Sequence, residues 1–223
     1  MRVSKGDIFE RVFINEPGVN LLIEQEAGSR VKIVIVNLEI SKSRGLEVLK
    51  QSCPSVAKNN ITVSQLGEGC STEIYALAFL HGSDSVTTET HVTHAVGGGT
   101  SVQLIKFVLD DNSRGRFIGD LKIAPDAQQT EAHQTNRNLL LSDTDEMRTQ
   151  PQLEIYADDV KATHGASSGQ LDESALFYMQ QRGIDKQKAR QLLVNAFMKE
   201  VLNTIGDERV REELLNSIDG VVE

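Results

Sequence analysis

Short strand-like runs joined by turns constrain this chain more than any other feature. Apolar residues alternate with a period of two between about residues 8 and 163, and the runs are rich in Val and Ile, which favour strands. Connecting pieces such as NEPGVN and DDNSRG carry turn residues, and only Arg44–Gln51 has an ambiguous helical pattern of useful length. A doubly wound α/β fold is therefore excluded. The expected strands are Ile8–Ile14, Leu21–Glu24, Val31–Ile40, Ile61–Gln65, Glu73–Leu80, Ser101–Leu109, Phe117–Ile123 and Leu153–Val160.

Two all-β folds remain, a β-sandwich and a parallel β-helix. Several connections are too long for two-residue hairpins. The phrases IEQEAGSRVKIVIVN and VSQLGEGCSTEIYAL both follow the order strand, glycine turn, strand, although no strict repeat period is visible. A solenoid with unequal coils accounts for this better than a sandwich does.

The apolar pattern becomes helical after Gly169. Three short amphipathic helices are expected. Asp172 and Asp185 are the N-caps of the first two, Gly183 and Gly206 end them, and the third begins at Asp207. Helices this short form little core alone, so they should pack on the β region or on another chain. The sequence thus divides into a β core over residues 1–166 and a helical domain over 167–223.

The composition limits partners and compartment. A net charge of −9, from 32 acidic and 23 basic residues, argues against nucleic acid or an anionic membrane as the main partner. The sequence has neither a membrane-spanning apolar run nor a signal-peptide pattern at its start, so a cytoplasmic location is expected. Cys53 and Cys70 form no CxxC motif and are expected to be reduced.

Residues 151–171, PQLEIYADDVKATHGASSGQL, contain the most informative histidine. Strand alternation ends near Asp158-Asp159, and His164 is followed by small residues typical of turns. His164 is therefore expected at the junction between β structure and helix. An imidazole there can bind a transition metal or transfer a proton, but the local pattern alone favours a simple hydrogen-bonded histidine.

For the other candidate motifs, the sequence pattern favours structural roles over metal binding, phosphate binding or catalysis. His91 and His94 have HxxH spacing, but in a strand they point to opposite faces, so packing roles are preferred to metal binding. Gly97-Gly98-Gly99 lacks the context of a phosphate loop. Asp110-Asp111 and Asp158-Asp159 have the chemistry for acid–base or Mg²⁺ roles, but they are also ordinary turn residues.

The segment AQQTEAHQTNRNLLL, residues 127–141, concentrates polar side chains ahead of three leucines. Its amides are suited to a buried ladder, where each polar group requires a partner. A solvated loop is the alternative. The leucines favour entry into buried structure.

Three long phrases resemble the SufB/SufD family of iron–sulfur cluster assembly scaffolds. They are AQQTEAHQTNRNLLLS, PQLEIYADDVKATHGASSGQLDESALFY and QQRGIDKQKARQLLVNAFMKEVL. HGASSGQLD resembles the SufD type, since SufB-like members carry glutamate at the position of Gly165. The resemblance implies a right-handed parallel β-helix followed by a C-terminal helical domain. Family members usually carry an N-terminal helical region, so the chain is expected to be a short variant or a fragment.

The resemblance also implies function. A SufD-like chain is a non-enzymatic subunit that pairs with SufB through the β-helix and receives the SufC ATPase on its helices. A transient iron–sulfur cluster or iron forms at the SufB interface, with none held by the isolated chain, and His164 matches the histidine that SufD contributes. Ala162 replaces a common family Cys. The expected partner-binding residues are Gln128, Gln134, Asn136, Ile155, Val160, Phe177, Tyr178, Arg182 and Phe197.

Two other functions remain open. A β-helix enzyme acting on carbohydrate would use the acidic pairs in a groove, although the absence of Trp argues weakly against sugar stacking. A homodimer with a purely structural role would pair the same β-helix surface with itself.

Overall fold

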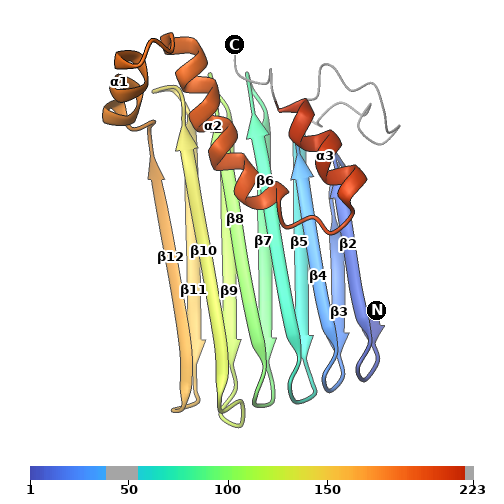
Figure 1. The fold of residues 1–223 in the computed structure, drawn as a ribbon. Helices are drawn as coiled ribbons and strands as arrows, with labels where there is room; N and C mark the ends of the chain where they lie inside the picture. The colour runs from blue at the N-terminus through green and yellow to red at the C-terminus, as the bar shows by residue number, and fades with distance from the viewer. Residues whose placement is uncertain (39–54, 219–223) are drawn as a thin grey trace.

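The computed structural model describes residues 1–38 and 55–218, and these fold as a parallel β-solenoid with helices on one side (Figure 1). Successive strands alternate between two six-stranded sheets, and every strand pairing in the described residues is parallel. This confirms the β-helix and excludes the sandwich, whose sheets would be antiparallel.

The strands have the following bounds. Sheet A contains β1 (Arg2–Val3), β3 (Asn20–Gln25), β5 (Val56–Gln65), β7 (Ser85–His94), β9 (Arg114–Ile123) and β11 (Glu146–Ile155). Sheet B contains β2 (Ile8–Ile14), β4 (Arg30–Asn37), β6 (Ser71–Leu80), β8 (Thr100–Leu109), β10 (Thr130–Leu140) and β12 (Val160–Gly169). The ambiguous stretch Arg44–Gln51 and the end of the predicted strand Val31–Ile40 lie outside the described residues.

The solenoid interior is filled by side chains that stack from coil to coil. Ile33 of β4 pairs in register with Ile74 of β6, and both are fully buried. Burying one such side chain stabilises a fold by about 1.5–3 kcal/mol. The stacked interior is therefore the main source of stability, and it sets which face of each strand points inward.

Four strands were not predicted, namely β1, β7, β10 and β12. β1 has only two residues. In β7 only two of the five inward positions are apolar, Val86 and Val92, which gives a weak apolar signal. In β10 they are held mainly by amides. The prediction that small residues after His164 form a turn is wrong, because β12 continues to Gly169. Likewise, the predicted strand Leu153–Val160 is interrupted by a corner at residues 156–159, so His164 lies within β12 rather than at the β-to-helix junction.

The three helices are α1 (Glu173–Gln181), α2 (Lys186–Leu202) and α3 (Glu208–Ser217). The predicted N-caps Asp172 and Asp185 are confirmed, because each carboxylate accepts a first-turn backbone N–H. Asp207 caps α3 in the same way. Gly183 follows α1 with φ +83°, a conformation that favours glycine. None of the described helices is long and apolar enough to cross a bilayer.

Helix α2 lies on the outer face of sheet B, over β6 and β8 (Figure 1). A second apolar cluster joins Val194, Met198 and Val201 to residues such as Val36 and Phe79. The sequence left packing on the β region or on another chain as alternatives, and α2 packs on the β region.

A buried lysine holds α2 to the sheet. Lys106 is 1% exposed, and its ammonium donates to the carbonyl of Phe197 at 2.9 Å and to the carboxylate of Glu200. It also lies 4.1 Å from the centre of the Phe197 ring. Burial lowers the pKa of Lys106, and the neighbouring Glu200 opposes that shift.

Candidate functional site

The last coil leaves one end of the solenoid open. Strands β11 and β12 are the outermost strands of their sheets at this end, and within the described residues each pairs on one side alone. Leu153, Val160 and Ala162 are only partly buried against the interior, and Ile155 is 41% exposed. Unpaired edges of this kind are templates for pairing with another chain.

His164 lies in the middle of the edge strand of this open end. It pairs in register with Gln134 of β10, and the alternation that turns Ala162 toward the core places His164 on the interior-facing side of β12. The residue is nevertheless exposed, since no further coil covers it. Its ring makes no hydrogen bond or ion pair with the described part of the chain. Both ring nitrogens are thus available to an external partner.

The backbone around His164 is accessible. A Cβ added at Gly165 or Gly169 would have no heavy atom within 4 Å, and the residues between them are small and exposed. By contrast, Pro151 stands within the other edge strand, β11, and offers no N–H. The β12 edge is therefore the better of the two for pairing with an added strand.

The polar block behind His164 is largely buried, which confirms the buried amides predicted there. Gln134 and Asn136 are each 1% exposed. The Asn136 amide donates to the carbonyl of Ile105 at 3.1 Å, exchanges hydrogen bonds with Asn138, and accepts from the Thr149 hydroxyl at 2.8 Å. Asn136 therefore ties the two sheets together inside the last coils, and the solvated-loop alternative is wrong for these residues.

Gln128 has a different position from the other two predicted polar interface residues. It is exposed at a corner, where its amide donates to the carbonyl of Pro125 at 2.9 Å. Its side-chain oxygen accepts the backbone N–H of Asp159 at 2.8 Å. Gln128 thus fixes the corner that leads into β12.

The HxxH histidines lie on opposite faces of β7, as predicted for a strand. His91 faces outward and its Nδ1 lies 2.8 Å from the Asp120 carboxylate. His94 is fully buried beside the Ser101 hydroxyl at 2.9 Å, and burial lowers its pKa to about 4. Among the described residues no group of three His, Cys, Asp or Glu side chains could hold a metal ion.

The remaining sequence motifs occupy the corners and the core. Asp110-Asp111 and Asp158-Asp159 both lie at corners between strands, as turn residues do. Gly97 also lies at a corner, where an added Cβ would stand 2.5 Å from the carbonyl oxygen of Gln128. Cys70 is a buried free thiol, and Cys53 lies outside the described residues.

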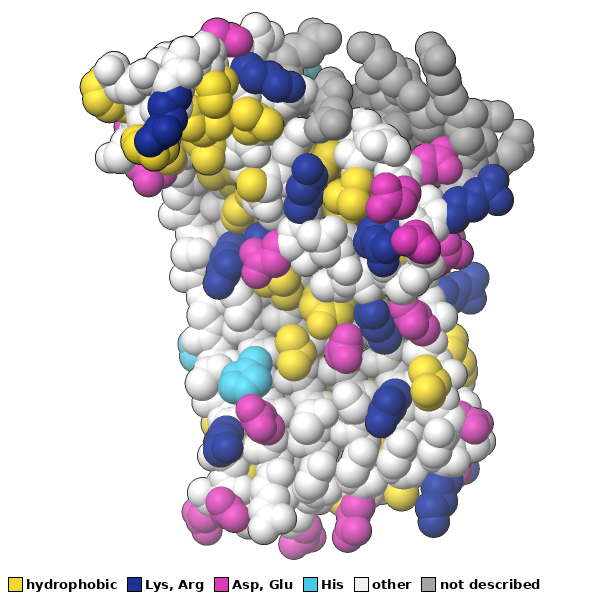
Figure 2. All heavy atoms as spheres, viewed as in Figure 1, with side chains coloured by type: hydrophobic (Ala, Val, Ile, Leu, Met, Phe, Trp, Pro, Cys, Tyr) yellow, Lys and Arg dark blue, Asp and Glu magenta, His cyan; other side chains and the backbone are white. Residues whose placement is uncertain are grey.

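The helical domain presents an exposed aromatic surface on α1. Phe177 is 62% exposed and Tyr178 is 58% exposed, and the Arg182 guanidinium lies 4.4 Å from the centre of the Tyr178 ring. Figure 2 shows hydrophobic side chains gathered over α1 and the adjoining part of α2, at the upper left. Phe197 is half-buried and held by Lys106, so its ring is already engaged within the chain.

Comparison of the sequence with known proteins places this chain in a family. Residues 21–197 match the sequence model described as "SUF system FeS cluster assembly, SufBD core domain". The chain belongs to the SufBD family. The matched range includes the open coil, His164, α1 and most of α2, so the SufBD resemblance found in the sequence is confirmed.

Individual relatives agree with this SufBD assignment. The iron–sulfur cluster assembly protein SufD of Escherichia coli is 37% identical over 74% of this chain and 39% of its own length. A SufBD family protein of Synechocystis is 36% identical over 82% of this chain and 37% of its own. The chloroplastic protein ABCI7 of Arabidopsis thaliana is 31% identical over 89% and 42%. The chain spans less than half the length of these curated relatives.

Proposed function

We propose that this chain acts as a SufD-like, non-enzymatic subunit of an iron–sulfur cluster assembly scaffold. In this proposal the open end of the solenoid binds a SufB-like subunit, and the helices bind a SufC-like ATPase. One observation carries it: an exposed histidine without internal partners stands at the open, unpaired end of a β-helix in a chain related to SufD.

The open end is suited to a second β-helix for two reasons. An unpaired parallel edge leaves backbone donors and acceptors that another strand would satisfy. Partly exposed interior residues, such as Ile155 and Val160, would also lose their contact with water when another coil covers them. A SufB-like β-helix supplies both kinds of contact, and the small residues of β12 admit it closely.

His164 would contribute one ligand to iron or to a nascent cluster, which is the cargo of the assembly. A neutral imidazole is a good ligand for iron. Its neighbours Ala162 and Gly165 add neither a thiolate nor a carboxylate. The other ligands are therefore assigned to the SufB-like subunit.

The exposed aromatic surface of α1 is the proposed docking site for the ATPase. Neighbouring aromatic side chains and an arginine are the residue types that dominate the energetics of protein interfaces. Phe177, Tyr178 and Arg182 provide this combination on a helix with a single buried residue, Leu176. Because α2 packs against sheet B and α3 joins the same apolar cluster, α1 is the helix with the most surface left for a partner.

Copurification with SufB-like and SufC-like proteins tests the two surfaces separately. Ile155→Lys should lower recovery of the SufB-like subunit, and Phe177→Ser with Tyr178→Ser should lower recovery of the ATPase alone. Ile8→Lys is the matched control, because Ile8 is 69% exposed on β2 at the opposite end of sheet B. Failure of the unaltered chain to recover either protein would contradict the scaffold role.

The same Ile155→Lys variant also tests whether the chain forms a homodimer. The open end of one copy can meet the open end of another, since an unpaired edge does not distinguish its partner. The mass of the isolated chain, measured with and without Ile155→Lys, reports self-association through this end. A dimer that persists when the SufB-like subunit is present would favour the purely structural role.

A further inference from the structure

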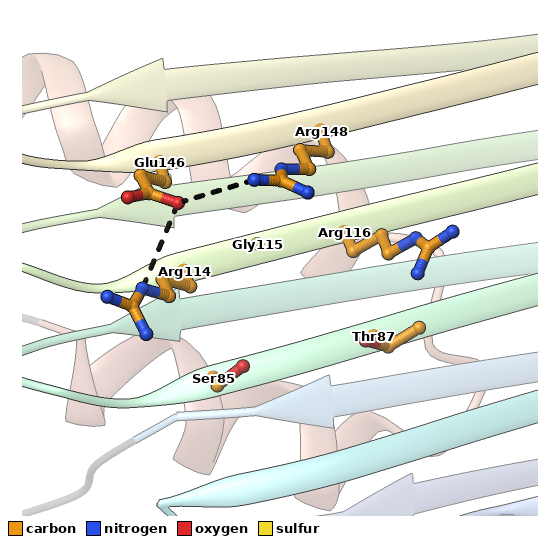
Figure 3. A pocket seen from close by; sticks show the side chains of 7 residues that line it. All are labelled: Ser85, Thr87, Arg114, Gly115, Arg116, Glu146 and Arg148. Atoms are coloured by element: carbon orange, nitrogen blue, oxygen red, sulfur yellow. Dashed lines mark ion pairs between the residues drawn. The ribbon is translucent and has the colours of Figure 1, made fainter.

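The outer face of sheet A carries a hollow bordered by three arginines, and its last strand, β11, is also an edge strand of the open end. Figure 3 shows the side chains that line it, which belong to β7, β9 and β11. Its volume is about 430 Å³, and it is lined by Ser85, Thr87, Arg114, Gly115, Arg116, Glu146 and Arg148. The helices lie on the other sheet, and His164 faces the solenoid interior. The hollow thus lies on a different face from the helices and from His164, next to the open end.

Strand register brings the arginines together on one face. Arg116 of β9 pairs directly with Arg148 of β11, and Arg114 pairs with Glu146 in the neighbouring row. Like charges directly opposite each other on adjacent strands are destabilising. The guanidinium groups of Arg116 and Arg148 therefore repel each other, and an anion bound between them would relieve that repulsion.

The single carboxylate in the hollow compensates only part of this charge. Glu146 lies 3.9 Å from the Arg114 guanidinium and 4.0 Å from that of Arg148, both at the outer limit for an ion pair. The Arg116 guanidinium has no ion pair or hydrogen bond with the described residues, and the hydroxyls of Ser85 and Thr87 have no hydrogen-bond partner there either. Three arginines and one glutamate leave a net charge of +2 beside two free hydroxyl donors.

We propose that this hollow binds a phosphoryl group. A phosphate monoester carries a charge of about −1.5 to −2 at neutral pH and three acceptor oxygens, which matches the charge and the donors of the hollow. Guanidinium groups bind phosphate oxygens through paired N–H donors, and serine and threonine hydroxyls add single donors. A ligand with a single carboxylate would neutralise only half of the +2 charge of the hollow. A phosphoryl group therefore complements the hollow better.

Phosphate binding to the full chain, measured by calorimetry at constant ionic strength, tests this assignment. The double variant Arg116→Gln, Arg148→Gln should weaken binding of inorganic phosphate about tenfold, the scale expected for losing charge-assisted hydrogen bonds. The matched control is Lys5→Gln, Lys122→Gln, which removes equal charge from exposed positions outside the hollow. This control should bind phosphate like the unaltered chain.

Thermal unfolding separates a lost site from a damaged fold. Without phosphate the arginine variant should unfold at the same temperature as the unaltered chain or higher, because it loses like-charge repulsion. With phosphate, only the unaltered chain and the lysine control should gain stability.

Two further probes identify the source of the phosphoryl group. Tighter binding of a phosphoserine peptide than of inorganic phosphate, with no binding of its unphosphorylated form, supports a phosphorylated protein partner. Equal binding of the two phosphate probes supports a small phosphorylated molecule. Equal losses in the arginine and lysine variants, or acetate binding as tight as phosphate binding, would overturn the proposal.

Discussion

His164 lies directly across from Gln134 in the pairing of β10 with β12, yet Gln134 is 1% exposed and His164 faces solvent. The two residues occupy equivalent inward positions on successive coils. The only difference is that a further coil covers Gln134. The exposure of His164 is therefore a property of the open end, and a partner that adds a coil would bury it.

Glycines in the last coils should differ sharply in their tolerance of a methyl group. A Cβ at Gly119 would stand 2.4 Å from the Gln134 amide nitrogen and 2.5 Å from the Phe117 ring, whereas Gly165 has open space. Gly119→Ala should lower the free energy of unfolding by about 1–3 kcal/mol, the usual cost of overpacking. Gly165→Ala should change it by less than about 0.5 kcal/mol. Urea denaturation measures both, and equal losses would contradict the packing described here.

The Lys106–Glu200 contact should contribute measurably to the docking of α2. Glu200→Gln leaves the buried ammonium of Lys106 with the Phe197 carbonyl and no carboxylate. We expect a loss of about 1–3 kcal/mol in unfolding free energy, because a buried charge loses its paired hydrogen bond. Arg137→Gln removes the exposed partner of Glu200, 3.3 Å away, and should cost less than about 1 kcal/mol. A larger loss in the Arg137 variant would reverse this ranking.

His94 should make stability depend on pH in a defined window. Burial holds its pKa at about 4 in the folded chain, against 6.5 for an unperturbed histidine. As the pH falls from 6.5 to 4 the unfolded chain takes up a proton that the folded chain excludes, so the His94 contribution falls by about 3 kcal/mol. His94→Gln should remove this component of the pH dependence, and the exposed-site variant His164→Ala should retain it. Urea denaturation at pH 5 and pH 7 provides the comparison.

The interior amides should not contribute equally. Neither polar atom of the Gln134 side chain has a hydrogen-bond partner in the described residues, whereas the Asn136 amide makes several hydrogen bonds. Gln134→Met should leave stability unchanged or raise it, because a buried amide without partners is costly. Asn136→Leu should lower the free energy of unfolding by about 1–3 kcal/mol, since Asn138 and Thr149 lose their partner. A loss of equal size in both variants would show that Gln134 is also hydrogen-bonded.

The sequence predicted the elements whose signals are local. Period-two alternation identified the apolar strands, and an aspartate marked the start of each helix. The solenoid period was not visible because the coils differ in length. Ser85 pairs with Arg114, 29 residues later, but Arg114 pairs with Glu146, 32 residues later.

The same distinction between local signals and pairing across coils applies to the site residues. The small residues after His164 have the composition of a turn, and only pairing with β10 makes them a strand. Arg114 and Arg116 have the two-residue spacing that places side chains on one face of a strand, and this signal could have marked them. Their approach to Arg148 depends on register between coils, which no local pattern encodes.

The role of His164 is tested most directly by the iron and sulfide content of the complex purified with SufB-like and SufC-like partners. His133→Ala is the matched control. His133 is next in sequence to Gln134, the in-register partner of His164, and its ring already contacts Glu131 and Thr163. We predict that the His164→Ala chain keeps its protein partners but loses most of the iron and sulfide, while the His133→Ala chain keeps the partners, the iron and the sulfide. Unchanged iron and sulfide in the His164 variant would contradict it.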